Sequence, residues 1–256
     1  MARALGVALG VLAIAVPGIS CGSGRKVGSA TLAAPPLTRE CGSFLSGFKG
    51  RPFWLGTADG VRLYAVESGS GSTTVVLAHQ GGSNLCDTIP YAKTLLANGL
   101  RVMAFDFRGN GLSKRPARDA LSLGRDLAAA VGRAHADGAR HVFLIGASMG
   151  GAAAVQNSAG LPVAGIVSLS GTRLWPGYGL NKPGPSGLRA PLLYVGGRDD
   201  SRAPLAEART VVRTAGSQDK RGVFYPGALH GWALVDETAP GPRTRALILS
   251  WIRARS

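Results

Sequence analysis

Acidic residues are scarce in this sequence. Its 14 aspartates and glutamates stand against 29 lysines and arginines, which gives a formal charge of +15 at pH 7. Such an excess could indicate a polyanionic partner. The basic residues are scattered, however, with no long basic block. Neither a zinc-type cysteine and histidine spacing nor a basic strand interleaved with aromatic residues is present. We therefore expect no nucleic-acid partner and no metal site.

Long apolar runs are also scarce, and one lies at the N-terminus, from Leu5 to Val16. It has about a dozen residues, too few for a membrane-spanning helix, which needs about 20. A short positive region, an apolar run and then small residues are typical of an export signal. We expect residues 1–20 to be a signal peptide and the mature protein to be exported.

Cysteines number only three. Cys21 stands where a bacterial lipoprotein signal has its acylated cysteine; Ser20 suits that signal, whereas Gly18 replaces the usual leucine or valine. Cys21 is thus either the site of a lipid that attaches the protein to the cell membrane, or an ordinary residue near a cleavage site in a secreted protein. Cys41 and Cys86 remain, and an oxidising location would allow a disulfide between them. The sequence leaves that pairing open.

Apolar residues are plentiful by contrast. They make up 45% of the 256 residues, and only 17% are charged, which is enough to build one large core. Residues 21–50 are rich in small residues and proline and indicate a flexible lead-in. We expect a single α/β domain over residues 51–256.

Apolar runs alternate with amphipathic segments through this domain. The runs have the length of buried strands, and the segments have helical spacing. This alternation predicts a mainly parallel sheet with helices on both faces. The expected strands are residues 61–66, 73–79, 100–107, 141–146, 163–170, 190–197 and 221–227, and the expected helices are residues 91–99, 122–138, 150–160, 204–216 and 243–256.

The connection over residues 171–189 is short and rich in glycine and proline. It cannot hold a lid domain, so we expect no sizeable lid. Its Trp175 and Tyr178 could line a pocket or cap the core.

Ser148 is the candidate nucleophile. It lies in Gly146-Ala147-Ser148-Met149-Gly150, between an expected strand and an expected helix. In that setting G-x-S-x-G predicts a sharp turn that exposes the serine at a helix N-terminus. The flanking glycines leave room for the strained backbone that such a turn requires.

A serine needs a base, and the chain has four histidines. His135 falls within an expected helix, and His79 and His141 lie at the ends of buried strands. His230 lies in a glycine-flanked loop after a late strand, so it is the candidate base. A carboxylate must orient that base. In the chain order serine, acid, histidine, only Asp199 and Asp200 directly follow a strand; Glu207 and Asp219 lie in or after a helix.

These residues and their order resemble the α/β-hydrolase superfamily, in particular its lid-less esterases and dienelactone hydrolases. "FDFRGNGLS" over residues 105–113 is similar to the family's D-x-R-G-x-G-x-S loop, and "LAHQGG" over residues 77–82 to its oxyanion loop. The likeness covers roughly residues 53–254. The spacing of "GRDDSRAP" over residues 197–204 favours Asp200 as the acid, with Asp199 as the alternative.

The resemblance also implies roles for neighbouring residues. The backbone amides of Gln80 and Met149 would form the oxyanion hole, although Gln80 replaces the glycine that is common after His79. His79 would brace this loop. Asp106 and Arg108 would form a structural pair near the site.

We therefore expect a serine hydrolase that cleaves an ester of a small molecule through an acyl-enzyme, with Ser148, Asp200 and His230 as its triad. We expect a monomer that needs no cofactor. Two alternatives remain open: an acyltransferase that uses the same triad, and a catalytically silent binding domain that has kept the fold.

Overall fold

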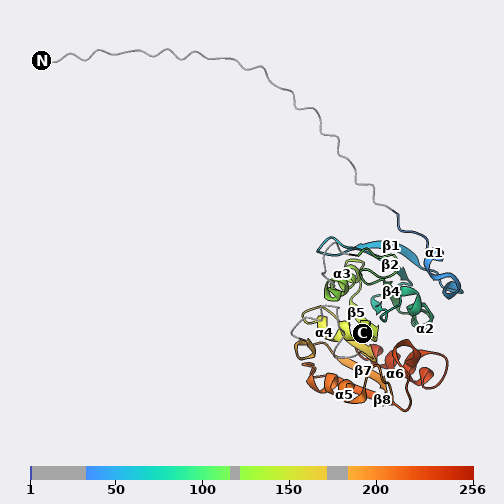
Figure 1. The fold of residues 1–256 in the computed structure, drawn as a ribbon. Coiled ribbons are helices and arrows are strands. Elements are labelled where there is room, and N and C mark those ends of the chain that lie inside the picture. The colour runs from blue at the N-terminus through green and yellow to red at the C-terminus, as the bar shows by residue number, and fades with distance from the viewer. Residues whose placement is uncertain (2–32, 116–121, 172–183) are drawn as a thin grey trace. The chain divides into compact units, whose positions relative to one another are not determined.

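The computed structural model describes residues 33–115, 122–171 and 184–256, and in these ranges eight strands form one sheet (Figure 1). The sheet has the order β1-β2-β4-β3-β5-β6-β7-β8. The two pairs that contain β2 are antiparallel, and every other neighbouring pair is parallel. The strands are β1 (Arg51–Gly56), β2 (Arg62–Ser68), β3 (Thr73–Ala78), β4 (Arg101–Phe105), β5 (His141–Ala147), β6 (Gly165–Leu169), β7 (Leu192–Gly197) and β8 (Lys220–Tyr225).

Helices cover both faces of the sheet (Figure 1). One face packs against α3, α4 and α5, and the other against α1, α2 and α6. The helices are α1 (Thr38–Cys41), α2 (Ile89–Ala97), α3 (Leu123–Ala136), α4 (Met149–Asn157), α5 (Leu205–Thr214) and α6 (Gly241–Arg253). Short 3-10 turns are η1 (Gly42–Leu45), η2 (Leu85–Thr88), η3 (Gly184–Gly187) and η4 (Gly231–Val235).

The central strands read as unbroken apolar runs because both of their faces are buried. In β3, Val76 and Ala78 pack toward α3 and α4, whereas Val75 and Leu77 pack toward α2. This two-layered core fixes the register of β3 against β5, in which Ala78 lies opposite Gly146. The carboxyl ends of the two central strands thereby meet at one edge of the sheet, and the predicted mainly parallel sheet with helices on both faces is confirmed.

One strand, β1, was not predicted as such. It pairs with β2 from Arg51 opposite Glu67 to Gly56 opposite Arg62. Phe53 and Leu55 are buried while their neighbours are more exposed. An edge strand with one covered face gives only a short alternating pattern, and a proline near its start weakens the signal further.

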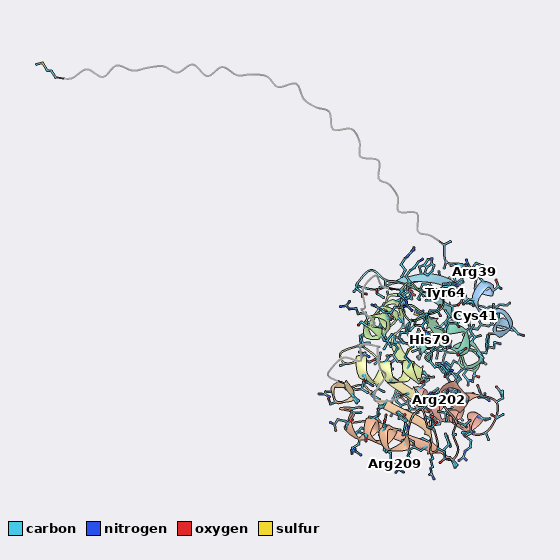
Figure 2. The ribbon with its side chains drawn as sticks, viewed as in Figure 1. Arg39, Cys41, Tyr64, His79, Arg202 and Arg209 are labelled. Carbon is cyan, nitrogen blue, oxygen red and sulfur yellow. A yellow bond between two sulfur atoms is a disulfide. The ribbon has the colours of Figure 1, made fainter. Side chains whose placement is uncertain are left out.

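The sequence pattern predicted that the domain starts at residue 51, but the packed part of the chain begins earlier. Leu37, Cys41 and Phe48 are buried in the core on the α2 side of the sheet. Cys41 is joined to Cys86 by a disulfide with a Cα–Cα distance of 5.1 Å (Figure 2). Tyr64 Oη also donates to the Pro35 carbonyl at 2.9 Å. The disulfide is the pairing that the sequence left open. The burial of Leu37 and Phe48 and the bond from Tyr64 are long-range contacts, which local composition could not reveal.

Several predictions fall on segments that the structure does not describe: the export signal with Cys21, and Trp175 and Tyr178. In the described ranges, no helix has the length and hydropathy needed to cross a bilayer.

Removal of the disulfide should destabilise the domain. The Cys41→Ser/Cys86→Ser variant should lose about 2–4 kcal/mol of unfolding free energy, because the bond restricts the unfolded chain. Denaturant titration monitored by tryptophan fluorescence measures this. Reductant should lower the midpoint of the wild-type protein and leave that of the variant unchanged. Equal midpoints of the oxidised wild type and the variant would contradict the prediction.

Candidate active site

Ser148 lies on a strained turn between β5 and α4. Its backbone has φ +48° and ψ −112°, and α4 begins at the next residue. Such angles cost a residue other than glycine about 1–3 kcal/mol and persist only when the surroundings hold them. Here the Ser148 amide donates to the Leu169 carbonyl at 2.8 Å, and its carbonyl accepts from the Ala152 amide at 2.8 Å. The turn is therefore tied both to β6 and to the first turn of α4.

The two glycines of the motif are required by close packing. A Cβ on Gly146 would come within 2.4 Å of the Gly150 carbonyl, and a Cβ on Gly150 within 2.2 Å of the Ala78 carbonyl oxygen. Both distances are too short for any real side chain. The first turn of α4 thus lies directly on the backbone at the end of β3, as the G-x-S-x-G pattern predicts.

His230 and Asp200 form a short hydrogen bond. His230 Nδ1 lies 2.6 Å from Asp200 Oδ2, and both side chains are nearly fully buried. Asp200 follows β7 and His230 follows β8, and these strands pair in parallel with Gly197 opposite Tyr225. Their carboxyl ends therefore bring together two residues that are 30 positions apart. Because an ionised carboxylate can only accept, Nδ1 carries the proton in this bond and Nε2 is left with its lone pair.

The second oxygen of Asp200 is held by the backbone. Its Oδ1 accepts from the amides of Arg202 at 3.0 Å and Ala203 at 3.3 Å. These contacts fix the carboxylate so that Oδ2 is aimed at His230. Orientation of this kind keeps the imidazole in one tautomer.

Asp199 points elsewhere. Its Oδ2 accepts from the Gly227 amide at 3.0 Å, and its own amide donates to the Gly227 carbonyl at 3.0 Å. It therefore bridges the ends of β7 and β8. Of the two candidate acids, the structure brings Asp200 against His230.

Ser148 and His230 face the same pocket. Its volume is about 240 Å³, and it is lined by Gln80, Gly81, Ser148, Arg202 and His230. The pocket lies at the carboxyl edge of the sheet, where open α/β folds bind their ligands. Sequence reasoning placed Ser148, His230 and Gln80 in the site but missed Arg202, although it lies only two residues after Asp200.

The loop after β3 is held by His79. Its Nε2 accepts from the Phe107 amide at 3.0 Å, so Nδ1 is the protonated nitrogen and donates to the Gln80 carbonyl at 2.7 Å. Burial lowers the pKa of His79 to about 4, and the ring is neutral at pH 7. His79 thus contacts the loop backbone, as expected of a bracing residue.

Gln80 lines this pocket, and Met149, the first residue of α4, follows Ser148 directly. The turn and loop hydrogen bonds of the described residues include none donated by the amide of Gln80 or Met149. The Gln80 side chain turns toward Gly231, whose Cβ would lie 2.4 Å from its Oε1, and Gly231 adopts φ +60°. The backbone of Gln80 can thus face a ligand while its side chain packs against the loop that carries His230.

Asp106 and Arg108 do not form the pair that the sequence suggested. The carboxylate of Asp106 accepts from the amides of Leu85 at 2.7 Å and Leu112 at 2.9 Å. Burial raises the pKa of Asp106 to about 7, although these amides favour its charged form. Arg108 instead binds the carboxylates of Asp126 and Asp59. Each of the two residues therefore organises loops through its own partners. The sequence did not indicate the partners of Arg108, because these acids lie far from it along the chain.

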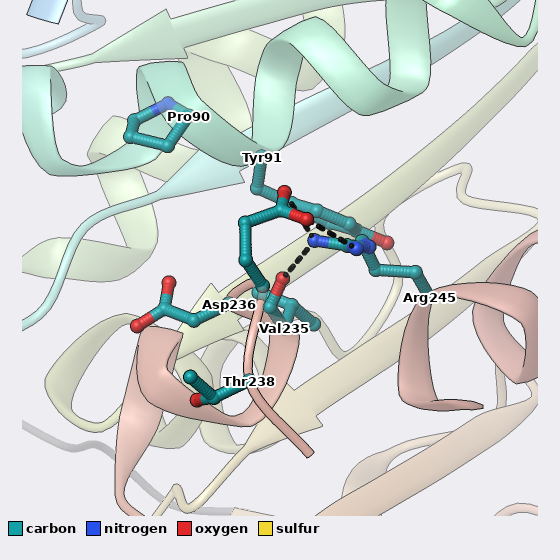
Figure 3. Close-up of a pocket in the computed structure, with 7 residues that line it drawn as sticks. Pro90, Tyr91, Val235, Asp236, Thr238 and Arg245 are labelled. Carbon is teal, nitrogen blue, oxygen red and sulfur yellow. Dashed lines mark hydrogen bonds and ion pairs between the residues drawn. The ribbon is translucent and has the colours of Figure 1, made fainter. Parts of the chain in front are cut away.

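A second pocket, of about 330 Å³, lies between α2 and the segment after η4 (Figure 3). Arg245 crosses it and donates to Glu237 at 2.8 and 3.0 Å and to the Val235 carbonyl at 3.1 Å. Its described lining residues include no serine, cysteine or histidine: they are Pro90, Tyr91, Val235, Asp236, Glu237, Thr238 and Arg245. The smaller pocket is thus the candidate active site. Within the described ranges, no cluster of three or more histidine, cysteine or acidic side chains could hold a metal ion.

Comparison with known proteins agrees with this fold. A model of the alpha/beta hydrolase family matches residues 75–255. No curated protein matches the chain. Among solved structures, the esterase Pf2001 of Pyrococcus furiosus superimposes with a TM-score of 0.69 at 17% identity, covering 88% of this chain and 97% of that one.

Two further structures show the same fold. An esterase from Thermogutta terrifontis has a TM-score of 0.64 at 17% identity, over 80% of this chain and 100% of the other. A monoacylglycerol lipase from Paleococcus ferrophilus has a TM-score of 0.62 at 19% identity, over 76% of this chain and 99% of the other. At these identities the likeness shows the fold alone.

The contact between α4 and β3 gives a test. Gly150→Ala should lower the unfolding free energy by about 1–3 kcal/mol, because the new methyl group must push α4 away from the Ala78 carbonyl. The matched control is Gly132→Ala in α3, where a Cβ would meet nothing within 4 Å. That change should stabilise the protein by up to about 1 kcal/mol. Thermal unfolding of both variants measures these stability changes. Equal changes in the two variants would contradict the close contact between α4 and β3.

Proposed function

Because the chain belongs to the alpha/beta hydrolase family, we propose that it is a serine hydrolase that cleaves carboxylic esters. The observation that carries the proposal is the 2.6 Å bond between buried Asp200 and His230, whose ring borders the same pocket as Ser148. A serine on a strained turn, a base beside it and an acid that orients the base are the parts of a nucleophilic triad.

The reaction follows from these positions. Ser148 Oγ attacks the ester carbonyl while His230 Nε2 takes its proton. The oxyanion that forms accepts hydrogen bonds from the amides of Gln80 and Met149. His230 then gives the proton to the departing alcohol, which leaves an acyl group on Ser148. Water, deprotonated by His230 Nε2, then attacks the acyl carbonyl. The bond between the acyl carbon and Ser148 Oγ breaks, His230 returns the proton to Oγ, and the carboxylic acid is released.

An ester is the proposed substrate because neighbours of the same fold include named esterases. An acyltransferase would share all of these residues and differ only in preferring an alcohol or amine to water. A silent binding domain would have no need for a serine held at φ +48° between close-packed glycines. The strained turn therefore favours a catalytic role.

Removal of the serine hydroxyl tests the mechanism. Ser148→Ala should lower kcat for p-nitrophenyl acetate at least about a thousandfold, because no nucleophile remains. Circular dichroism should show an unchanged fold. The wild type should also be labelled by a fluorophosphonate probe and the variant should not. Wild-type-like turnover by Ser148→Ala would overturn the mechanism, and a folded wild type that neither turns over nor labels would favour the silent domain.

The two neighbouring aspartates provide a matched pair of variants. Asp200→Asn should lower kcat by about a thousandfold to ten-thousandfold, because an amide there no longer fixes the tautomer or stabilises the imidazolium. Asp199→Asn should stay within a few-fold of wild type, since its amide oxygen can still accept from Gly227. Steady-state kinetics with p-nitrophenyl acetate compares them. A larger loss at Asp199 would reverse the assignment of the acid.

A further inference from the structure

Arg202 brings a positive charge into the candidate active site. It is one of five residues that line the pocket with Ser148 and His230, and none of the five is acidic. Arg202 is an exposed residue, so it lies on the solvent side of this pocket. An ester that enters the pocket therefore meets a guanidinium close to the reacting serine.

The position of Arg202 is fixed by the acid itself. Its backbone amide donates to Asp200 Oδ1 at 3.0 Å, and the next residue, Ala203, is buried and donates to the same oxygen. The Cα of Arg202 is thus held in a set relation to Asp200 and, through Asp200, to His230. Because this backbone is already held in place, binding of a ligand costs only the conformational entropy of the Arg202 side chain and not that of the loop.

The guanidinium of Arg202 has no acidic partner in the described part of the chain. Arg245 in the second pocket is different, since Glu237 binds it through two hydrogen bonds (Figure 3). Arg108 is likewise bound by Asp59 and Asp126. Of the two pockets, the one with the serine thus presents an arginine that is not neutralised by a carboxylate.

An unneutralised guanidinium favours an anionic ligand, and a carboxylate matches its planar pair of donors. The lining residues hold no second cation, so a singly charged carboxylate fits better than a doubly charged phosphate. The net charge of +15 adds a field that attracts anions. The Asp200 carboxylate already accepts hydrogen bonds from His230 and two amides, so its oxygens are not left to pair with the Arg202 guanidinium.

We propose that Arg202 binds a carboxylate on the substrate, so that the protein prefers esters that carry a free carboxylate near the scissile bond. This inference rests on the proposed hydrolase function and narrows its substrate class. Arg202 would be a specificity-determining residue, because the proton transfers need only Ser148, His230 and Asp200.

Two esters of equal chain length test the proposal: the mono-p-nitrophenyl ester of glutarate, which is anionic, and p-nitrophenyl pentanoate, which is neutral. The wild type should favour the anionic ester in kcat/KM at low salt. Arg202→Gln should lower the anionic-to-neutral ratio at least tenfold, and Arg202→Lys should keep part of it. Sodium chloride at high concentration should lower the ratio in the wild type and change it little in Arg202→Gln.

The control is Arg209→Gln. Arg209 is an exposed arginine on α5 that does not line the pocket (Figure 2). This variant has the same change in net charge and should keep the wild-type ratio. An unchanged ratio in Arg202→Gln would overturn the proposal. An equal loss for both esters would do so too, because it would mean that Arg202 acts on the reacting carbonyl. An equal fall of the ratio in both variants would assign the preference to net charge.

A binding measurement separates this inference from the proposed function. Calorimetry with glutarate should detect binding to Ser148→Ala and at least tenfold weaker binding to Ser148→Ala/Arg202→Gln. If the wild type hydrolyses neither ester but glutarate binding depends on Arg202, the hydrolase proposal fails and the carboxylate site stands. If glutarate binds both variants equally or neither, the carboxylate site is overturned, whatever the turnover.

Discussion

The whole site depends on how closely α4 approaches the end of β3. Gly150 lies so near the carbonyl groups of Ala78 and His79 that no side chain fits between them. This contact holds Ser148 at its positive φ and places the serine at the N-terminus of α4. It also sets the serine turn against the loop that starts at His79. The strain at Ser148 is thus offset by packing that only glycine permits.

The other half of the site follows from parallel pairing. β7 and β8 end side by side, and the residues that follow them are held by a short set of hydrogen bonds. Asp199 joins the two strand ends through Gly227, and Asp200 bonds His230. Neighbouring aspartates thus have separate tasks, because their carboxylates meet different partners in the turn that follows β7. The register of the sheet decides which of them meets the histidine.

Much of this arrangement could be predicted from local patterns. The strand, turn and helix around Ser148 leave a periodic and glycine-marked signal, and elimination among four histidines isolates His230. The edge strand β1 was not predicted, because its alternation is too short. The sequence offered the pairing of Cys41 with Cys86 without deciding it, and the structure shows that this bond holds the segment before β1. The partners of Arg108 were missed because they are distant in sequence: Asp59 and Asp126 are 49 and 18 positions away.

The protein has few acidic residues, and several of them bind buried partners inside the fold. Asp59 and Asp126 bind the buried Arg108, Asp106 binds loop amides, and Asp200 binds His230. With 14 acidic residues for 29 basic ones, few carboxylates remain to neutralise the surface. An exposed arginine without an acidic partner is therefore unremarkable in this protein, and Arg202 is distinguished by its place. Its backbone is bonded to the acid that orients His230, and its side chain borders the pocket of Ser148. The same carboxylate can thus orient the proposed base and fix where a positive charge meets the substrate.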